Sequence, residues 1–312
     1  MKVAAIGAGA WGKNIIRSLS ELDVLAAVID LSSEKCAEYT QAYPGIATHG
    51  NYREAIAADY DAFVIATPTP LHYEIARAAL EADKDVLIEK PMTATSLQAE
   101  TLVRLAEQRG RILMAGHLLL YQPAIQWIKE FLDAGTLGTL YTVHQERLGL
   151  GRARPLENVL WDCGVHDLAV LLLLVGNVPC GIRASGHRIV QPTVEDDVYV
   201  HLEFPCGVRA SLHNSWLWPE TRRRLVVRGS EGMLVYDELA QTVTLHRKGI
   251  TPDLQNRDDG SEIILRGNGE PLKLELQHFL ARVQDRQPPL SDGRSALQVI
   301  EVLEQVSHLL ES

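Results

Sequence analysis

The chain has 312 residues, of which 46% are hydrophobic, so it can bury the cores of two domains of ordinary size. Lysine and arginine number 30 and aspartate and glutamate 40, which gives a net charge of −10 at pH 7. This acidic balance disfavours non-specific binding to nucleic acid or to an anionic membrane, since both require a basic face. Four widely spaced cysteines, with no signal-peptide pattern and no long apolar run, predict a cytoplasmic protein with reduced thiols.

Short apolar runs alternate with helical patterns through the first third of the chain. The runs are the expected strands, at Val3–Ile6, Val24–Ile29, Ala62–Ile65, Asp85–Ile88 and Ile112–Ala115. Helical segments such as Tyr73–Ala82 and Ser96–Gln108 lie between them. This alternation predicts βαβ units, with a parallel sheet covered by helices on both faces, in a first domain at residues 1–118.

The pattern changes after a helix expected at Pro123–Leu132. Alternating apolar residues then predict strands near 140–147, 198–204, 208–212, 224–227, 233–236 and 242–246, with helices at about 161–175 and at the C-terminal end. Turns containing glycine are expected at 205–207, 229–232 and 248–249. We expect a second, α+β domain at 119–312 with an open, mostly antiparallel sheet. One face of that sheet would be covered, and the other would be apolar enough for a dimer contact.

A glycine-rich segment, Gly7-Ala8-Gly9-Ala10-Trp11-Gly12, follows the first expected strand and opens a helix. In this context G-x-G-x-x-G predicts a dinucleotide site: Gly7 makes the turn, Gly9 admits the pyrophosphate, and Gly12 lets helix and strand pack closely. Asp30 ends the second strand, where a carboxylate binds the adenosine ribose and repels a 2′-phosphate. NAD is therefore expected rather than NADP. The alternative is a plain glycine turn with Asp30 as a helix cap.

Two polar segments follow the third and fourth expected strands. They are Thr67-Pro68-Thr69-Pro70-Leu71-His72 and Glu89-Lys90-Pro91. Because ligands bind at the carboxyl ends of strands in open α/β sheets, both segments are expected to face the cofactor. Lys90 beside the nicotinamide would hydrogen-bond the substrate hydroxyl and accept its proton. Its position alone fits a surface lysine equally well.

A third segment is Trp161-Asp162-Cys163-Gly164-Val165-His166-Asp167. Asp162 and His166 are four residues apart, so at a helix start they lie on one face, and a carboxylate beside an imidazole suits a general base. One alternative is a helix cap with an interior histidine. Another is a metal held by Asp162, Cys163 and His166, which is not expected because no fourth ligand has convincing spacing.

Taken together, these motifs resemble those of the Gfo/Idh/MocA family, named after glucose–fructose oxidoreductase and inositol dehydrogenase. The shared residues are the glycine fingerprint, Thr67, Pro68 and His72 of T-P-x-x-x-H, Glu89–Pro91 of E-K-P, and Asp162, Gly164 and His166 of D-x-G-x-H. The resemblance implies an NAD-binding Rossmann domain, an open-faced sheet domain and a catalytic set of Lys90, Asp162 and His166. There are two departures. G-H-L-L-L-Y at 116–121 stands where members often have G-F-N-R-R-F, and Ala169 replaces a usual aspartate, with Asp167 nearby.

The substrate expectation also comes from this resemblance. Residues 116–124, 160–168 and 215–224 look similar to dehydrogenases that act at C3 of UDP-N-acetylhexosamines and supply a 3-keto sugar to an aminotransferase. Cations for a pyrophosphate would come from Arg147, Arg152, Arg154 and Arg222–Arg224. The expected substrate-binding residues are Lys90, His117, Tyr121, Arg152, Arg154, Asn158, Trp161, Asp162 and His166.

Two other functions fit the same residues less well. One is an inositol or free-monosaccharide dehydrogenase, and the other is a non-catalytic, sugar-responsive NAD-binding regulator. A regulator has no need of a Lys–Asp–His set, which this chain retains. The expected partners are a sugar or nucleotide-sugar substrate and copies of the chain itself, as a homodimer or homotetramer.

Overall fold

The computed structural model describes residues 1–151, 153–267 and 269–311, so the expected substrate residue Arg152 lies outside the described residues. The chain divides into two compact units, Met1–Leu118 with Glu270–Glu301, and Leu119–Gly269 with Val302–Ser312. The break after Leu118 falls where the sequence predicts it. The expectation that 119–312 forms a single domain does not match this division, because Glu270–Glu301 pack with the first unit.

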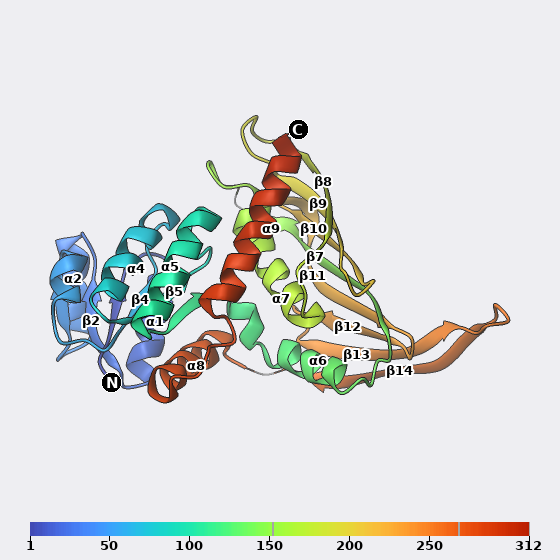
Figure 1. The fold of residues 1–312 in the computed structure, drawn as a ribbon, viewed down its shortest axis with the longest axis horizontal. Coiled ribbons are helices and arrows are strands. Elements are labelled where there is room, and N and C mark those ends of the chain that lie inside the picture. The colour runs from blue at the N-terminus through green and yellow to red at the C-terminus, as the bar shows by residue number, and fades with distance from the viewer. Residues whose placement is uncertain (152, 268, 312) are drawn as a thin grey trace. The chain divides into compact units, whose positions relative to one another are not determined.

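The first unit is built on a six-stranded parallel sheet with the order β3-β2-β1-β4-β5-β6 (Figure 1). Its strands are β1 Val3–Ile6, β2 Leu25–Ile29, β3 Ala47–His49, β4 Ala62–Ile65, β5 Asp85–Glu89 and β6 Leu113–Gly116. Every residue of β1 and β4 is buried, which explains their unbroken apolar runs. The order is that of a Rossmann fold and confirms the predicted class. The short β3 was not predicted because it carries no apolar run.

Helices connect these strands. They are α1 Gly12–Glu21, α2 Ser33–Ala42, α3 Tyr52–Ile56, α4 His72–Glu81 and α5 Ser96–Arg109, with a 3-10 turn, η1, at Thr69–Leu71. From the C-terminal part of the chain, α8 Pro271–Asp285 joins this unit, followed by the first part of α9 Gly293–Glu311. Arg286 anchors the end of α8 to the sheet, because its guanidinium contacts both carboxylate oxygens of buried Asp85, at 2.7 and 2.8 Å.

The second unit is built on an eight-stranded sheet with the order β14-β13-β12-β11-β7-β10-β9-β8 (Figure 1). Its strands are β7 Leu140–Leu150, β8 Gly181–His187, β9 Asp197–Glu203, β10 Arg209–Ser215, β11 Leu217–Gly229, β12 Met233–Asp237, β13 Thr242–Ile250 and β14 Asn256–Arg266. Neighbouring strands are antiparallel except β7 and β10, so the predicted open, mostly antiparallel sheet is confirmed. Strands β8 and β14 were not predicted because they form the partly exposed sheet edges.

The turns of this sheet match the sequence at two of three predicted places. Gly207 and Gly232 take positive φ values between paired strands, as expected of hairpin turns. Lys248 and Gly249 lie inside β13 instead, with Lys248 paired to Asp258 of β14 at 2.9 Å. Glycine is no turn signal here because β13 and β14 extend beyond it and join only after Ile250.

One face of the second sheet is covered by α6 Pro123–Asp133 and α7 Val165–Val175 (Figure 1). Ala210 and Leu212 point to this face and are buried. The opposite face is more polar than the sequence analysis expected. Partners in register across it are His144, Glu146, Tyr199, Ser211, His213, Arg222 and Arg224, with Leu148, Val226 and Val235 as apolar members.

Candidate active site

The glycine-rich turn follows β1 and leads into α1. Gly7 has a φ of +98°, and a Cβ there would lie 2.6 Å from the carbonyl oxygen of Ala66. A Cβ on Gly12 would lie 1.9 Å from the carbonyl oxygen of Gly7. A Cβ on Gly9, by contrast, would meet no atom within 4 Å. The fold therefore requires glycine at the first and third positions, while the open space at Gly9 suits a ligand that approaches the backbone.

Asp30, at the end of β2, lies against this turn. Its Oδ2 accepts a hydrogen bond from the Ala8 N–H at 2.9 Å, and its Oδ1 accepts one from the Ser32 N–H at 2.9 Å. Lys35 Nζ lies 3.2 Å from Oδ2. Burial disfavours the charged form, but these donors outweigh it and lower the Asp30 pKa. Asp30 is therefore a carboxylate at neutral pH, and Lys35 is a nearby cation that the sequence argument for NAD did not weigh.

The two segments that follow β4 and β5 are joined by His72. Its Nδ1 lies 2.9 Å from the Pro91 carbonyl oxygen and its Nε2 lies 2.7 Å from that of Thr67. His72 is buried, so the imidazole holds the two segments together rather than presenting its nitrogens to a cofactor. The hydroxyl of Thr67 is also buried and has no hydrogen-bond partner among the described residues, so it is available to a ligand.

Glu89 ends β5 immediately before Lys90. Its Oε1 accepts a hydrogen bond from the indole Nε1 of Trp11, in the glycine-rich turn, at 2.5 Å. Burial raises the pKa of Glu89 to about 7, although the Trp11 indole and the Lys90 backbone and charge oppose the shift. Two of the predicted cofactor residues, Trp11 and Glu89, therefore bind each other and connect the glycine-rich turn to the E-K-P segment.

His117 follows β6 and carries a neutral imidazole. Its side chain is buried, and burial, followed by the charge of Lys90, lowers its pKa to about 4. Neither ring nitrogen has a hydrogen-bond partner among the described residues. A buried neutral imidazole with both nitrogens unused has one donor and one acceptor that no described residue satisfies.

The D-x-G-x-H segment does not form the regular helix start that the sequence predicted. Residues Leu160–Gly164 form a π-helical turn, η3, that leads directly into α7. Glycine leaves room here for two neighbouring side chains, because a Cβ on Gly164 would lie 2.5 Å from both Asn214 Oδ1 and Leu160 Cδ1 and would displace them. Asp162 lies in this turn and His166 in the first turn of α7. Single π turns are frequent at functional sites, where they reposition a side chain relative to the helix that follows.

Three other expected substrate residues surround this turn. Arg154 is exposed, and its Nε lies 3.3 Å from Asp162 Oδ1. Asn158 is buried; its Oδ1 accepts from the Trp161 N–H at 3.1 Å and its amide donates to Glu195 at 2.9 Å. The Trp161 indole donates to Ser307 Oγ at 2.9 Å. The polar groups of Asn158 and Trp161 therefore hold the start of the turn. Arg154, by contrast, faces solvent. Tyr121, in the 3-10 turn η2 Leu118–Tyr121, is buried.

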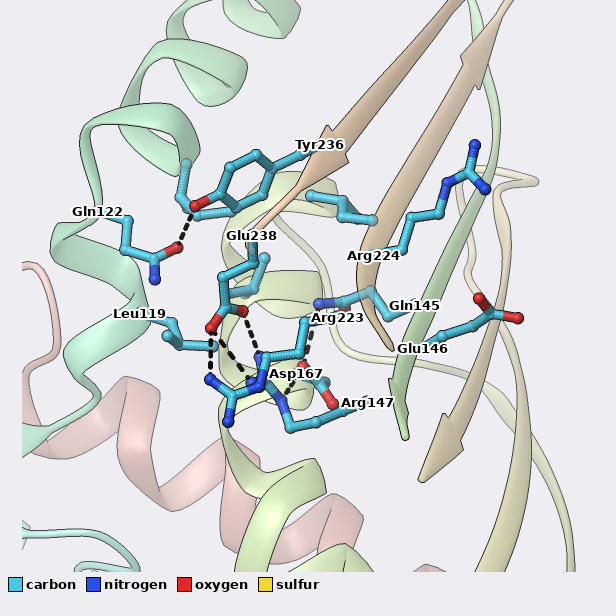
Figure 2. Close-up of a pocket in the computed structure, with 13 residues that line it drawn as sticks. Leu119, Gln122, Gln145, Glu146, Arg147, Asp167, Arg223, Arg224, Tyr236 and Glu238 are labelled. Carbon is cyan, nitrogen blue, oxygen red and sulfur yellow. Dashed lines mark hydrogen bonds and ion pairs between the residues drawn. The ribbon is translucent and has the colours of Figure 1, made fainter. Parts of the chain in front are cut away.

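Arg147 and Arg223 contribute to a pocket under the second sheet (Figure 2). Arg147 Nε lies 3.0 Å from Asp167 Oδ1, and its Nη2 lies 2.9 Å from Glu238 Oε2. Arg223 also contacts Glu238, at 3.2 Å. The Asn214 amide donates to Asp167 at 2.7 Å. Because these charges pair with one another, Arg147 and Arg223 are not available to bind a pyrophosphate.

No group of three histidine, cysteine, aspartate or glutamate side chains among the described residues is placed to hold a metal ion. No helix in the same part of the chain is long and apolar enough to span a membrane. The four cysteines are free thiols.

The fold and these motifs define the class of protein. Residues 1–117 match the Gfo/Idh/MocA oxidoreductase family with an NAD-binding Rossmann fold, and residues 125–235 match the C-terminal domain of the same family. The chain belongs to this family of enzymes, and its cofactor is NAD. The residues fit that cofactor through the open space at Gly9, the carboxylate of Asp30 and the unused hydroxyl of Thr67.

Similar proteins include enzymes that act on sugars and cyclitols. UDP-N-acetylglucosamine 3-dehydrogenase of Acidithiobacillus ferrooxidans is 29% identical over 100% of this chain and 98% of that protein. Its solved structure superposes with a TM-score of 0.89 at 27% identity, covering 100% of this chain and 98% of its own. A putative oxidoreductase from Magnetospirillum magnetotacticum is 31% identical, with a TM-score of 0.84 and coverage of 97% and 98%. The scyllo-inositol 2-dehydrogenase (NAD(+)) of Bacillus subtilis is 27% identical over 74% of this chain and 69% of its own.

Proposed function

We propose that this enzyme oxidises the C3 hydroxyl of a UDP-N-acetylhexosamine with NAD, giving a 3-keto sugar for a downstream aminotransferase. The observation that carries the proposal is the similarity to the Acidithiobacillus ferrooxidans enzyme, which spans both units of the chain. The partial similarity to a scyllo-inositol dehydrogenase favours a second candidate, oxidation of an inositol or a free monosaccharide. In both cases the reaction removes a hydride and a proton from a secondary alcohol.

Lys90, Asp162 and His166 are assigned to the chemistry. NAD, when bound, supplies the hydride acceptor. Either Lys90 or His166 takes the hydroxyl proton as the carbonyl forms, and the other stabilises the developing alkoxide. Asp162 orients the imidazole and stabilises its protonated form. Lys90 is half-buried at the carboxyl end of β5, where ligands bind in Rossmann folds, which supports its assignment.

Recognition of the substrate is assigned to His117, Arg152 and Arg154. His117 offers two unused ring nitrogens to a sugar hydroxyl. Arg154 is exposed, which suits contact with a pyrophosphate, and it contacts Asp162 as well. Arg152 keeps the same role as an expectation from sequence. Asn158 and Trp161 act by shaping the turn that carries Asp162, not by direct contact with the sugar.

The experiment that tests the proposal is a screen of NADH production. The purified enzyme is supplied with NAD and with UDP-N-acetylglucosamine, free N-acetylglucosamine or myo-inositol. We expect turnover with the nucleotide sugar only. Turnover with myo-inositol alone would establish the second candidate, and turnover with none of them, while NAD still binds, would contradict both.

We also propose that the enzyme is a cytoplasmic homodimer or homotetramer formed through the open face of the second sheet. Tyr199, which is 36% exposed, and the neighbouring rings of His213 and Trp218 support this, because aromatic residues are enriched in protein interfaces. The free thiols of all four cysteines suit a reducing compartment. Light scattering at micromolar concentration should show an oligomer. A strictly monomeric species would contradict this assembly.

A further inference from the structure

Arg154 and Asp162 form an ion pair at the π-helical turn of the second unit. Arg154 Nε lies 3.3 Å from Asp162 Oδ1, and the two side chains are 46% and 14% exposed. The other carboxylate oxygen, Oδ2, accepts a hydrogen bond from the Cys163 thiol at 3.5 Å. The carboxylate that is assigned to orient His166 is therefore in direct contact with an exposed cation.

The main chain of Arg154 is held in place although its side chain faces solvent. Its carbonyl oxygen accepts a hydrogen bond from Gln191 Nε2 at 2.6 Å, which joins the segment after β7 to the segment after β8. Pro155 follows directly and disfavours a helical backbone at Arg154. The contact with Asp162 therefore starts from a fixed main chain and does not depend on the side chain alone.

Arg154 uses only part of its hydrogen-bonding capacity in this contact. Every nitrogen of a guanidinium is a donor, and Arg154 directs Nε toward Asp162. Neither of its terminal nitrogens has a partner among the described residues. Arg188 of the same unit differs, because its Nε and Nη2 both contact Glu195, at 2.8 and 2.7 Å. The terminal nitrogens of Arg154 therefore suit a bidentate contact with phosphate oxygens.

We propose that Arg154 binds the diphosphate of the substrate and the carboxylate of Asp162 at the same time. The terminal nitrogens hold the phosphate oxygens, and Nε holds Asp162 Oδ1. Arg154 is then a positioning residue for Asp162 as well as a determinant of specificity for a nucleotide. This role rests on the proposed function, since the nucleotide sugar carries a diphosphate and an inositol or a free monosaccharide does not.

Two physical effects link the diphosphate to Asp162. An exposed ion pair is weak alone, because water competes with it and a long side chain loses freedom in it. A diphosphate on the terminal nitrogens removes that freedom on binding, so the binding energy of a remote part of the substrate orders the carboxylate. The guanidinium also lies between two anions, the diphosphate and Asp162, which would repel each other without it.

The first test measures nucleotide binding without catalysis, by calorimetric titration of the NAD-bound enzyme with UDP. Arg154→Met should weaken UDP binding about ten- to a hundredfold, because hydrogen bonds between charged groups are lost. Arg154→Lys should weaken it less, since an ammonium keeps the charge without the planar fork. The control is Arg183→Met in β8, which removes a cation that is 85% exposed and should leave UDP binding unchanged. Equal binding by Arg154→Met, or no binding by the wild type, would overturn the proposal.

The second test separates positioning from binding, with UDP-N-acetylglucosamine as the substrate. Arg154→Met should lower kcat about tenfold at saturating substrate, because an orienting contact is lost. Arg154→Lys should also lower kcat, while its KM stays closer to the wild-type value. In the Asp162→Asn background, Arg154→Met should lower kcat by less than about twofold, because the carboxylate that it orients is already gone. Equal factors in the two backgrounds would show a merely structural role and overturn the proposal.

Failure of this role and failure of the proposed function give different results. A wild type that turns over no nucleotide sugar would refute the proposed function and, with it, the link between the diphosphate and Asp162. A wild type that turns over the nucleotide sugar, with a kcat that Arg154→Met leaves unchanged, would refute only the positioning role.

Discussion

The cofactor end of the first unit and the start of α7 in the second unit are built in different ways. In the first unit Gly7 follows β1, Asp30 follows β2 and Lys90 follows β5. Parallel strands all end at one edge of the sheet, so their positions follow from the strand order. In the second unit Asp162 lies in a π-helical turn that packs against Asn214 of β10, more than fifty residues further along the chain. A site at strand ends is set by topology, and a site at a helix start is set by packing.

The largest expected effect tests whether the two regions act in one reaction. Lys90→Met, His166→Ala and Asp162→Asn should each lower kcat by about 10²- to 10⁴-fold while NAD affinity stays nearly unchanged, because each removes an acid–base or orienting group. The double variant Lys90→Met/His166→Ala should lose much less than the product of the single effects. Steady-state kinetics and NAD titration check both points. Near-wild-type turnover of the double variant would place the chemistry elsewhere.

A second prediction separates a buried arginine from an exposed one in the second unit. Arg147→Met should lower the free energy of unfolding by about 3–5 kcal/mol, because it leaves Asp167 and Glu238 without their cation. Arg154→Met, the matched control, should change it by less than about 1 kcal/mol and instead raise the KM for a nucleotide sugar. Chemical denaturation and kinetics measure the two quantities. Equal losses of stability would show that Arg154 is also structural.

A third prediction separates two glycines of the same fingerprint in the first unit. Gly12→Ala should destabilise the fold by about 1–3 kcal/mol, because its Cβ would overlap the Gly7 carbonyl oxygen. Gly9→Ala should leave the melting temperature unchanged, since its Cβ meets only open space, and should weaken NAD binding. Thermal unfolding with and without NAD distinguishes them. If Gly9→Ala binds NAD normally, the cofactor does not approach this turn as assigned.

The smallest expected effect concerns Asp30. Asp30→Ala should weaken NAD binding about ten- to a hundredfold, because hydrogen bonds to a charged group are lost, and should narrow the preference for NAD over NADP. Lys35→Met is the matched control and should widen that preference. Because the folded-state pKa of Asp30 lies below its usual 3.8, its contribution to stability is present at neutral pH and is lost as the pH falls below that value. Equal binding of NAD and NADP by the wild type would refute the assignment.

The sequence alone determined the fold class and placed the candidate residues at the strand ends. These follow from local patterns: buried parallel strands are continuous apolar runs, and a glycine fingerprint between strand and helix has few other uses. The sequence did not predict the edge strands β8 and β14. It also did not predict that Glu270–Glu301 pack with the first unit. Partly exposed edges carry weak patterns, and packing between distant segments carries none.

The tertiary structure decided which polar residues are free to act. The sequence offers both Arg147 and Arg154 as cations for a pyrophosphate, but Asp167 and Glu238 surround the first, and the second faces solvent. Glu275 has no motif and no neighbour in sequence that marks it, yet folding buries it, with one carboxyl oxygen lacking a hydrogen-bond partner among the described residues. The availability and charge state of a side chain depend on burial and on partners that are far away in the sequence, and for that reason only the folded chain specifies them.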